Sequence, residues 1–191
     1  MESQRYTKIA IWLHWLVAIG IIANVALAWI WPLGDSHESI APYVRPMIDT
    51  HKSIGLSILG LAALRLLWRL GHRPPAFPAR YQPWERTLAH IVHWGLYVVI
   101  FAMPITGYVM DSAYKDAATH PFYLFGAFDF PRLGFIMSLP PDTKEWVHST
   151  FGAAHELIAK LVYVLVVLHL AGALKHQLQG HKEVQRMGVG R

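Results

Sequence analysis

Residues 152–176, GAAHELIAKLVYVLVVLHLAGALKH, decide the fold of this chain. The stretch is apolar enough to cross a membrane as a helix, yet it contains His155 and His169, fourteen residues apart. Fourteen residues make almost four helical turns, so both rings leave one helix face about 21 Å apart along the axis. Imidazole is costly in lipid and normally faces a partner inside the protein. The spacing predicts two buried cofactors, one near each membrane surface; two unrelated histidines at helix ends are the alternative.

The composition of the whole chain indicates a membrane protein. Its 191 residues are 54% hydrophobic and only 15% charged, which is too apolar for an ordinary soluble domain. The sequence contains no cysteine, which excludes disulfides, thiolate metal sites, cysteine-ligated iron–sulfur clusters and C-x-x-C-H haem attachment. Twelve histidines remain, so histidine is the ligand type to consider.

Three further segments are also long and apolar enough to span a membrane. Together with the last one, the expected helices cover about 9–31, 48–70, 87–110 and 152–176. A short surface helix is expected at about 142–149, where Asp142 and Glu145 have the spacing of a capping box. The predicted fold is a single all-α membrane domain, 1–191, in which four helices form an up-down bundle.

Charged residues are distributed unevenly between the two ends of the expected bundle. The end with both termini and the loop 71–86 has eleven Lys and Arg against three acidic residues. The opposite end has five basic residues against nine acidic ones. The positive-inside rule therefore predicts a multi-pass protein of the cytoplasmic membrane with both termini in the cytoplasm. Because membrane topology explains the net charge of +5, we expect no nucleic-acid partner.

This topology sorts the helical histidines by depth. His51 is expected level with His155 near the outer surface, and His14 level with His169 near the inner surface. Two histidines saturate a haem iron, which suits electron transfer better than oxygen binding. Zinc is disfavoured, because further ligands are missing at the outer level and carboxylates are missing at the inner level. Depth alone leaves His14 and His93 as alternatives for the inner partner of His169.

Several sequence pieces, taken in order, resemble the bacterial cytochrome b561 family, a relative of the di-haem cytochrome b subunits of nickel–iron hydrogenases and formate dehydrogenases. They are WLHWLVA at 12–18, HKSIGL at 51–56, LRLLWRL at 64–70, HIVHWGLY at 90–97, MPITGYVM at 103–110 and the His155–His169 spacing. The resemblance covers nearly the whole chain and implies two haem b groups between the first, second and fourth helices. It implies His14 and His169 as axial ligands of the inner iron. For the outer iron it implies His51 and His155.

The same resemblance implies a function in respiratory electron transfer. A member of this family is expected to connect a donor on the periplasmic side with the quinone pool, with ubiquinone as the electron partner. Some family members are superoxide oxidases, which pass an electron from periplasmic superoxide to ubiquinone. The alternative is a membrane-anchor cytochrome b subunit that links a soluble redox protein to quinone.

A second group of polar residues is expected near the two haems: His90, His93, His176, Arg65, Arg69 and Lys52. The first five lie at the inner depth, where they contact a quinone head group or haem propionates, or are ordinary interfacial side chains. Lys52 either pairs with an outer propionate or lies at the surface. The histidines of expected loops and tails are predicted to be solvated: His37, His72, His120, His148 and His181.

Overall fold

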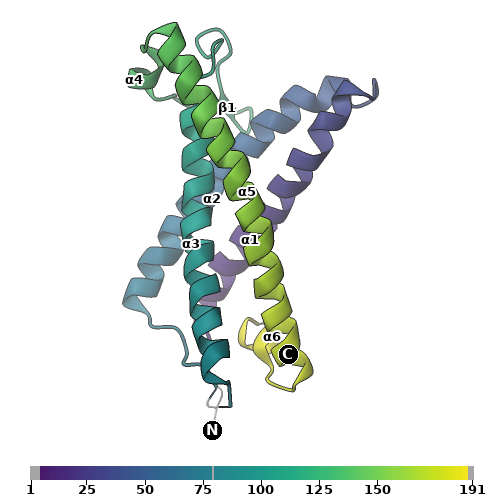
Figure 1. Ribbon diagram of the computed structural model, residues 1–191, viewed down its shortest axis with the longest axis vertical. Helices are drawn as coiled ribbons and strands as arrows, with labels where there is room; N and C mark the ends of the chain where they lie inside the picture. The colour runs from purple at the N-terminus through teal and green to yellow at the C-terminus, as the bar shows by residue number, and fades with distance from the viewer. Residues whose placement is uncertain (1–4, 79, 189–191) are drawn as a thin grey trace.

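The computed structural model describes residues 5–78 and 80–188; the chain ends, 1–4 and 189–191, which belong to the predicted cytoplasmic side, lie outside the described residues. The long helices are α1 (Lys8–Ile30), α2 (Val44–Gly71), α3 (Pro83–Ser112) and α5 (Pro141–Leu178). In length and composition each of these helices is able to cross a membrane. They run alternately up and down, and α1 begins at the end of the molecule where α5 ends (Figure 1). The predicted four-helix membrane bundle is confirmed.

Short elements connect the long helices. Two 3₁₀ turns, η1 (Trp31–Asp35) and η2 (Ala41–Tyr43), join α1 to α2. The connection from α3 to α5 contains an antiparallel hairpin, β1 (Tyr123–Leu124) and β2 (Phe128–Asp129), and the short helix α4 (Gly134–Met137). A last short helix, α6 (Glu183–Arg186), follows α5. We call the end with the hairpin and α4 the outer end, and the end with α6 the inner end.

α2 and α3 each begin four residues earlier than the sequence pattern predicted. α2 starts at Val44, because Pro46 lies in its first turn, where a backbone N–H has no partner within the helix. α3 starts with Pro83 at its first position, which suits the fixed backbone of proline. The N–H of Gln82 donates to Oε2 of Glu85 over 2.8 Å, as in a capping box. Prolines that marked loops in the sequence thus lie at helix starts.

The separate surface helix expected at about 142–149 is wrong. Those residues form the first turns of α5, which continues through them into the membrane span without a break. The predicted capping box of Asp142 and Glu145 is wrong as well, since Pro140 holds the N-cap position. Thr150, Phe151 and Gly152 join these turns to the apolar stretch as helix, and the one glycine costs a helix only about 1 kcal/mol.

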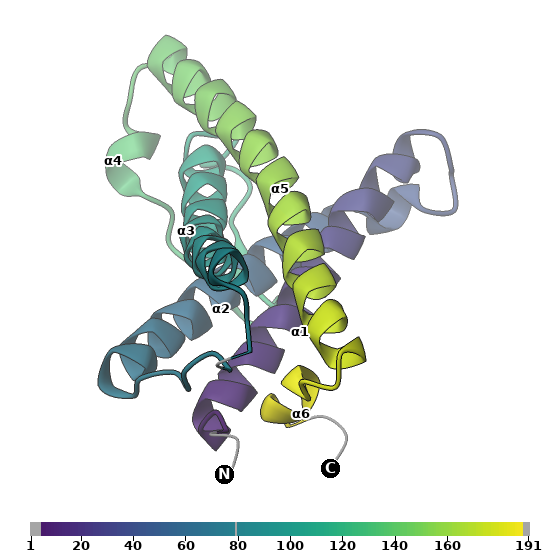
Figure 2. The same cartoon turned by 60° about the horizontal axis from the view of Figure 1, so that its bottom comes forward.

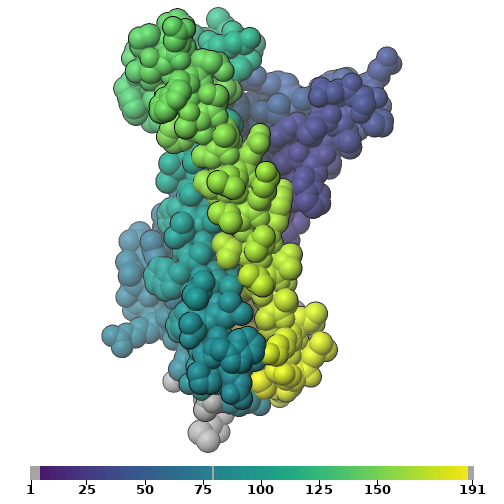
Figure 3. Space-filling view, viewed as in Figure 1, coloured from purple at the N-terminus to yellow at the C-terminus, as the bar shows by residue number. Residues whose placement is uncertain are grey.

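The long helices pack as two pairs. α1 packs along α2, α3 packs along α5, and contacts between α2 and α3 join the pairs. Within the described part of the chain, α1 and α5 cross without extensive backbone packing. The crossing of the two pairs is visible from two directions (Figure 1, Figure 2), and Figure 3 shows the outer ends of α1 and α2 standing apart from α5. The contacts of α5 with α1 and α2 are therefore made by side chains, without close approach of the backbones.

The outer connection between α3 and α5 is folded against the helices. The N–H of Phe125 donates to Oγ of Ser53 on α2 over 2.9 Å. Phe122, at the base of the hairpin, is 1% exposed, and the Tyr108 hydroxyl of α3 donates to the carbonyl of Pro131. The aromatic residues of this connection are thus anchored on α2 and α3.

A buried ion-pair network fastens the same connection. Asp111, near the end of α3, lies 2.8 Å from Nε of Arg132 and 2.7 Å from Nζ of Lys52 on α2. Arg132 also donates to the carbonyl oxygens of Ala117 and His120. The side chains of Arg132 and Asp111 are only 4% and 10% exposed. Loss of either partner therefore leaves a charge buried without its counter-ion.

We expect Asp111→Asn to destabilise the outer end, because the substitution leaves two cations facing a neutral amide. Breaking a buried ion pair costs about 3–5 kcal/mol. Thermal unfolding of the purified protein in detergent measures the loss, with Glu145→Gln, an exposed carboxylate on α5, as the control. Equal unfolding temperatures for the two variants would contradict a stabilising role for the network.

Candidate functional site

Four histidines from three helices form two pairs inside the bundle. His51 of α2 lies opposite His155 of α5, with ring centroids 6.3 Å apart. His14 of α1 lies opposite His169 of α5, with ring centroids 6.0 Å apart. Helix α5 provides one member of each pair, because fourteen residues return a side chain to nearly the same helix face. The structure therefore brings together the same pairs that expected depth suggested.

The separation within each pair fits one metal ion between two imidazoles. Two metal–nitrogen bonds of about 2 Å each, with the distance from each nitrogen to its ring centre, separate two centroids by about 6 Å. The observed separations are 6.3 and 6.0 Å. No group of three or more His, Cys, Asp or Glu in the described residues is arranged to hold a metal ion. Two-histidine ligation of a haem iron therefore fits these side chains better than a zinc site does.

At the outer pair, His51 has a hydrogen-bond partner that fixes its tautomer. Its Nδ1 lies 3.2 Å from the backbone carbonyl oxygen of Asn24 on α1. A carbonyl oxygen only accepts, so Nδ1 carries the hydrogen and donates it. The other ring nitrogen, Nε2, is then unprotonated and able to bind a metal, as in most histidine metal sites.

His155 is held in the same way by a side chain of α3. Its Nδ1 lies 3.1 Å from Oγ1 of Thr106, whose hydroxyl donates to the carbonyls of Ala102 and Met103 at 2.8 and 3.0 Å. Because the hydroxyl hydrogen is already used, Oγ1 accepts the hydrogen from Nδ1. Gly107 leaves room for the ring, since a Cβ there would lie 3.1 Å from Cε1 of His155. α3 contributes no histidine to the outer pair, yet it orients the ring of His155.

The inner pair has a different neighbour. Arg65 of α2 places Nη1 2.8 Å from Nδ1 of His14 and donates from Nε to the Tyr97 hydroxyl over 3.2 Å. A guanidinium only donates, so Nδ1 of His14 accepts and the ring hydrogen lies on Nε2. For Nε2 of His14 to bind iron, Arg65 has to release Nδ1. A carboxylate, such as a haem propionate, is a stronger acceptor for the guanidinium.

His93 of α3 is a third histidine at the inner level. Its ring centroid lies 5.4 Å from that of His169, compared with 6.0 Å for His14. Both separations are near the length of a two-imidazole metal site. The ring separations therefore leave both His14 and His93 as alternatives for the partner of His169, as the expected depth did. All three rings lie at the inner site.

Aromatic rings and a second arginine surround the inner site. The guanidinium of Arg69 lies 5.1 Å from the ring centroid of Trp94 and 5.4 Å from that of Tyr97. Phe77, from the connection between α2 and α3, lies nearly parallel to His93 at 6.5 Å. The Phe77 ring also meets His90 edge-on, at 5.1 Å. Flat apolar rings beside a few hydrogen-bond donors are typical of sites for aromatic ligands.

His176 lies two turns beyond His169 and belongs to another cluster. Its ring stacks on Tyr81 at 3.8 Å, and its Nδ1 is 3.1 Å from Nδ1 of His181. The prediction that His181 is solvated is therefore wrong, since its ring packs against His176 and Tyr81. Burial, and after it the nearby Glu183 carboxylate, raises the pKa of Tyr81, so its hydroxyl stays protonated.

His148 was also predicted to be solvated in a loop, and this is wrong. It lies within α5, and its Nδ1 donates to the carbonyl of Met110 over 2.9 Å.

Lys52 is held by carboxylates, 2.7 Å from Asp111 and 3.5 Å from Asp49, and its side chain is 20% exposed. A propionate that paired with Lys52 would have to compete with Asp111.

Sequence reasoning missed the partners of the predicted site residues: Asn24, Thr106, Tyr97, Asp111 and Arg132. Polar residues inside apolar spans, such as Asn24 and Thr106, are a signal that would have singled out two of them. Nothing in the sequence indicated that Arg132 pairs with Asp111, because Arg132 lies in a long aromatic connection with several other charges. These partners come together only when the helices cross.

Known proteins similar to this chain are consistent with the site. Residues 5–190 match the family model described as prokaryotic cytochrome b561. The chain is 31% identical to cytochrome b561 homolog 2 of Escherichia coli strain K12, over 98% of this chain and 93% of the relative. It is 28% identical to the probable superoxide oxidase CybB of Yersinia pestis, over 91% and 89%. Cytochrome b561 homolog 1 of E. coli is 26% identical, over 96% of each chain. The chain therefore belongs to the prokaryotic cytochrome b561 family, whose members are haem-containing electron-transport proteins of the membrane.

Proposed function

We propose that the protein is a di-haem b cytochrome that carries electrons across the membrane between an outer donor and the quinone pool. The support is the presence of two histidine pairs at two levels of α5, each with the centroid separation of a two-imidazole metal site. His51 and His155 hold the outer haem, and His14 and His169 hold the inner one. Bound haem would supply one-electron chemistry there, and ligation of the iron by two imidazoles would leave no open position for oxygen.

Two levels are what electron transfer through a bilayer requires. The histidines of α5 are about 21 Å apart along the helix axis, which covers most of a ~30 Å hydrocarbon core. The excess of Lys and Arg at the inner end supports a cytoplasmic position for that end. The two histidine pairs would therefore hold their haems near opposite surfaces of the membrane, which suits transfer of electrons across it.

Quinone reacts at the inner site in this proposal. Arg65, Arg69 and the Tyr97 hydroxyl are donors for the quinone oxygens, and His90 and His93 provide further ring nitrogens beside them. The flat rings near these donors suit the quinone ring. Reduction of ubiquinone to ubiquinol takes up two electrons and two protons. His176 is separated from these donors by its own cluster and is assigned no direct quinone contact.

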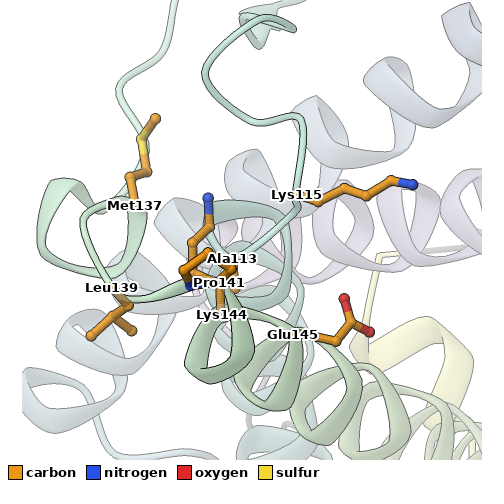
Figure 4. Close-up of a pocket in the computed structure, with 7 residues that line it drawn as sticks. All are labelled: Ala113, Lys115, Met137, Leu139, Pro141, Lys144 and Glu145. Carbon is orange, nitrogen blue, oxygen red and sulfur yellow. The ribbon is translucent and has the colours of Figure 1, made fainter.

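Superoxide is the proposed donor, on the strength of the relative named a probable superoxide oxidase. Three cations and two carboxylates surround the end of α2 that carries His51: Arg45, Lys52, Arg132, Asp49 and Asp111. A hollow at the outer end of α5 adds Lys115 and Lys144 beside Glu145 (Figure 4). The outer end as a whole carries more acids than bases, so attraction of an anion is local there.

The alternative function is a membrane-anchor cytochrome b subunit that receives electrons from a soluble redox protein. Its supporting observation is a group of aromatic side chains on the outer connection, each at least 47% exposed: Tyr123, Phe125, Phe128 and Phe135. Exposed aromatic rings are enriched where proteins meet each other.

We expect His51→Ala or His155→Ala to remove the outer haem alone, because each pair is needed to hold one iron. For the same reason, His14→Ala or His169→Ala should remove the inner haem alone. Haem content per chain and the optical spectrum of the purified variants measure the loss.

His37→Ala is the matched control, since His37 is exposed and lies in the η1–η2 connection. This variant should keep the full haem content. If His93→Ala lost a haem while His14→Ala kept both, His93 rather than His14 would be the inner ligand.

Arg69→Gln is expected to slow electron transfer from the reduced haems to ubiquinone about tenfold or more, because a hydrogen bond from a charged donor contributes about 1.5–3 kcal/mol. Stopped-flow oxidation of the haems by a soluble ubiquinone analogue measures the rate. Arg73→Gln, an exposed arginine of the neighbouring connection, is the control. Equal rates in both variants and in the unmodified protein would remove Arg69 from the quinone site.

Reduction of the haems by superoxide should be fast, should slow as salt is added, and should slow several-fold in Lys52→Glu, because a local positive field raises the encounter rate. Stopped-flow absorbance at several salt concentrations measures this. Lys182→Glu makes the same charge change at the inner end and should leave the rate unchanged. Slow reduction without salt dependence would favour a protein donor instead.

A further inference from the structure

The two histidine pairs differ in what meets their Nδ1 atoms. At the outer pair, both Nδ1 atoms donate to oxygen, one to the Asn24 carbonyl and one to the Thr106 hydroxyl. At the inner pair, His14 faces the guanidinium of Arg65. No hydrogen bond joins the ring of His169 to another residue in the described ranges 5–78 and 80–188. Each Nδ1 of the outer pair thus has an oxygen acceptor, whereas the inner pair has the positively charged side chain of Arg65 beside it.

Burial and hydrogen bonds to the α3 backbone hold the side chain of Thr106 at this contact with His155. It is 9% exposed, and its hydroxyl hydrogen is directed to the carbonyls of Ala102 and Met103, so only a lone pair faces His155. Gly107 next to it leaves room for the ring of His155, because a Cβ there would lie only 3.1 Å from Cε1 of that ring. The hydroxyl therefore favours the tautomer with hydrogen on Nδ1 and helps to orient this imidazole, together with the Met103 backbone carbonyl.

Such contacts change how strongly an imidazole donates electrons to iron. An imidazole that gives its Nδ1 hydrogen to oxygen is a more basic ligand at Nε2, and a more basic ligand favours the oxidised metal. A positive charge next to a site favours the reduced, less positive metal. Arg65 keeps its charge beside the inner pair even when a haem propionate becomes its acceptor, although the propionate offsets part of the effect. Both differences make the outer haem easier to oxidise than the inner one.

We infer that Thr106 is a positioning residue for His155 and that, with the Asn24 carbonyl, it gives the outer haem the lower midpoint potential of the two. Transfer of one electron from the outer to the inner haem would then be downhill, with the outer haem oxidised, the inner haem reduced and no proton required. The site thereby directs electrons from the outer donor toward quinone. This inference rests on the proposed two-haem function.

Potentiometric titration of Thr106→Val, followed by haem absorbance, tests the inference, because valine keeps the shape and removes the hydroxyl. The lower midpoint potential should rise, with a three- to tenfold change in the oxidised-to-reduced ratio of that haem at a fixed potential; tenfold corresponds to about 59 mV for one electron. The higher midpoint should not move. Thr106→Ser keeps the hydroxyl and should retain both original midpoints.

Two further variants make the titration decisive. His155→Ala keeps only the inner haem, and its single midpoint should equal the higher one of the unmodified protein. Thr87→Val removes an exposed hydroxyl of the same helix that donates to the carbonyl of Pro83, and it should change neither midpoint.

Haem content is measured in every variant before titration. Fewer than two haems per chain in the unmodified protein would overturn the proposed function and this inference together. Two haems with unchanged midpoints in Thr106→Val, or with only the higher midpoint shifted, would overturn the inference alone. Loss of only the outer haem in Thr106→Val, with both haems kept in Thr106→Ser, would support the positioning role.

Discussion

The structure depends on one constraint: an imidazole inside a membrane has to find its partners within the protein. α5 carries two such rings on one face, fourteen residues apart, and the other helices are arranged around them. α1 and α2 bring His14 and His51 opposite these rings, and α3 brings Thr106 and His93 beside them. The loose crossing of α1 and α5 follows from the same constraint, since side chains rather than backbones meet there.

The charges at the two ends of the bundle have different consequences. At the outer end, carboxylates neutralise most of the cations near His51, and the network of Asp111 and Arg132 fixes the connection that covers this end. At the inner end, Arg65 and Arg69 face rings and hydroxyl groups rather than carboxylates, so they remain available to an acidic or carbonyl ligand. This difference suits an inner site that binds quinone and propionates.

Much of the fold could be predicted from the sequence, because spans of this length and composition have few alternatives in a bilayer. Errors arose where the local pattern was ambiguous: Pro46 and Pro83 were interpreted as loop residues although proline is tolerated in a first helical turn, and the spacing of Asp142 and Glu145 was interpreted as the start of a separate helix. The histidine levels followed from helix periodicity. Asn24 and Thr106 did not, because their contacts depend on how helices distant in sequence cross.

The central claim is that each chain holds two b haems, one between each pair of histidines. Pyridine haemochrome analysis of the purified protein, combined with a quantitative protein assay, tests this claim most directly. We predict two haem b groups per chain. One haem per chain, or none, would contradict the claim.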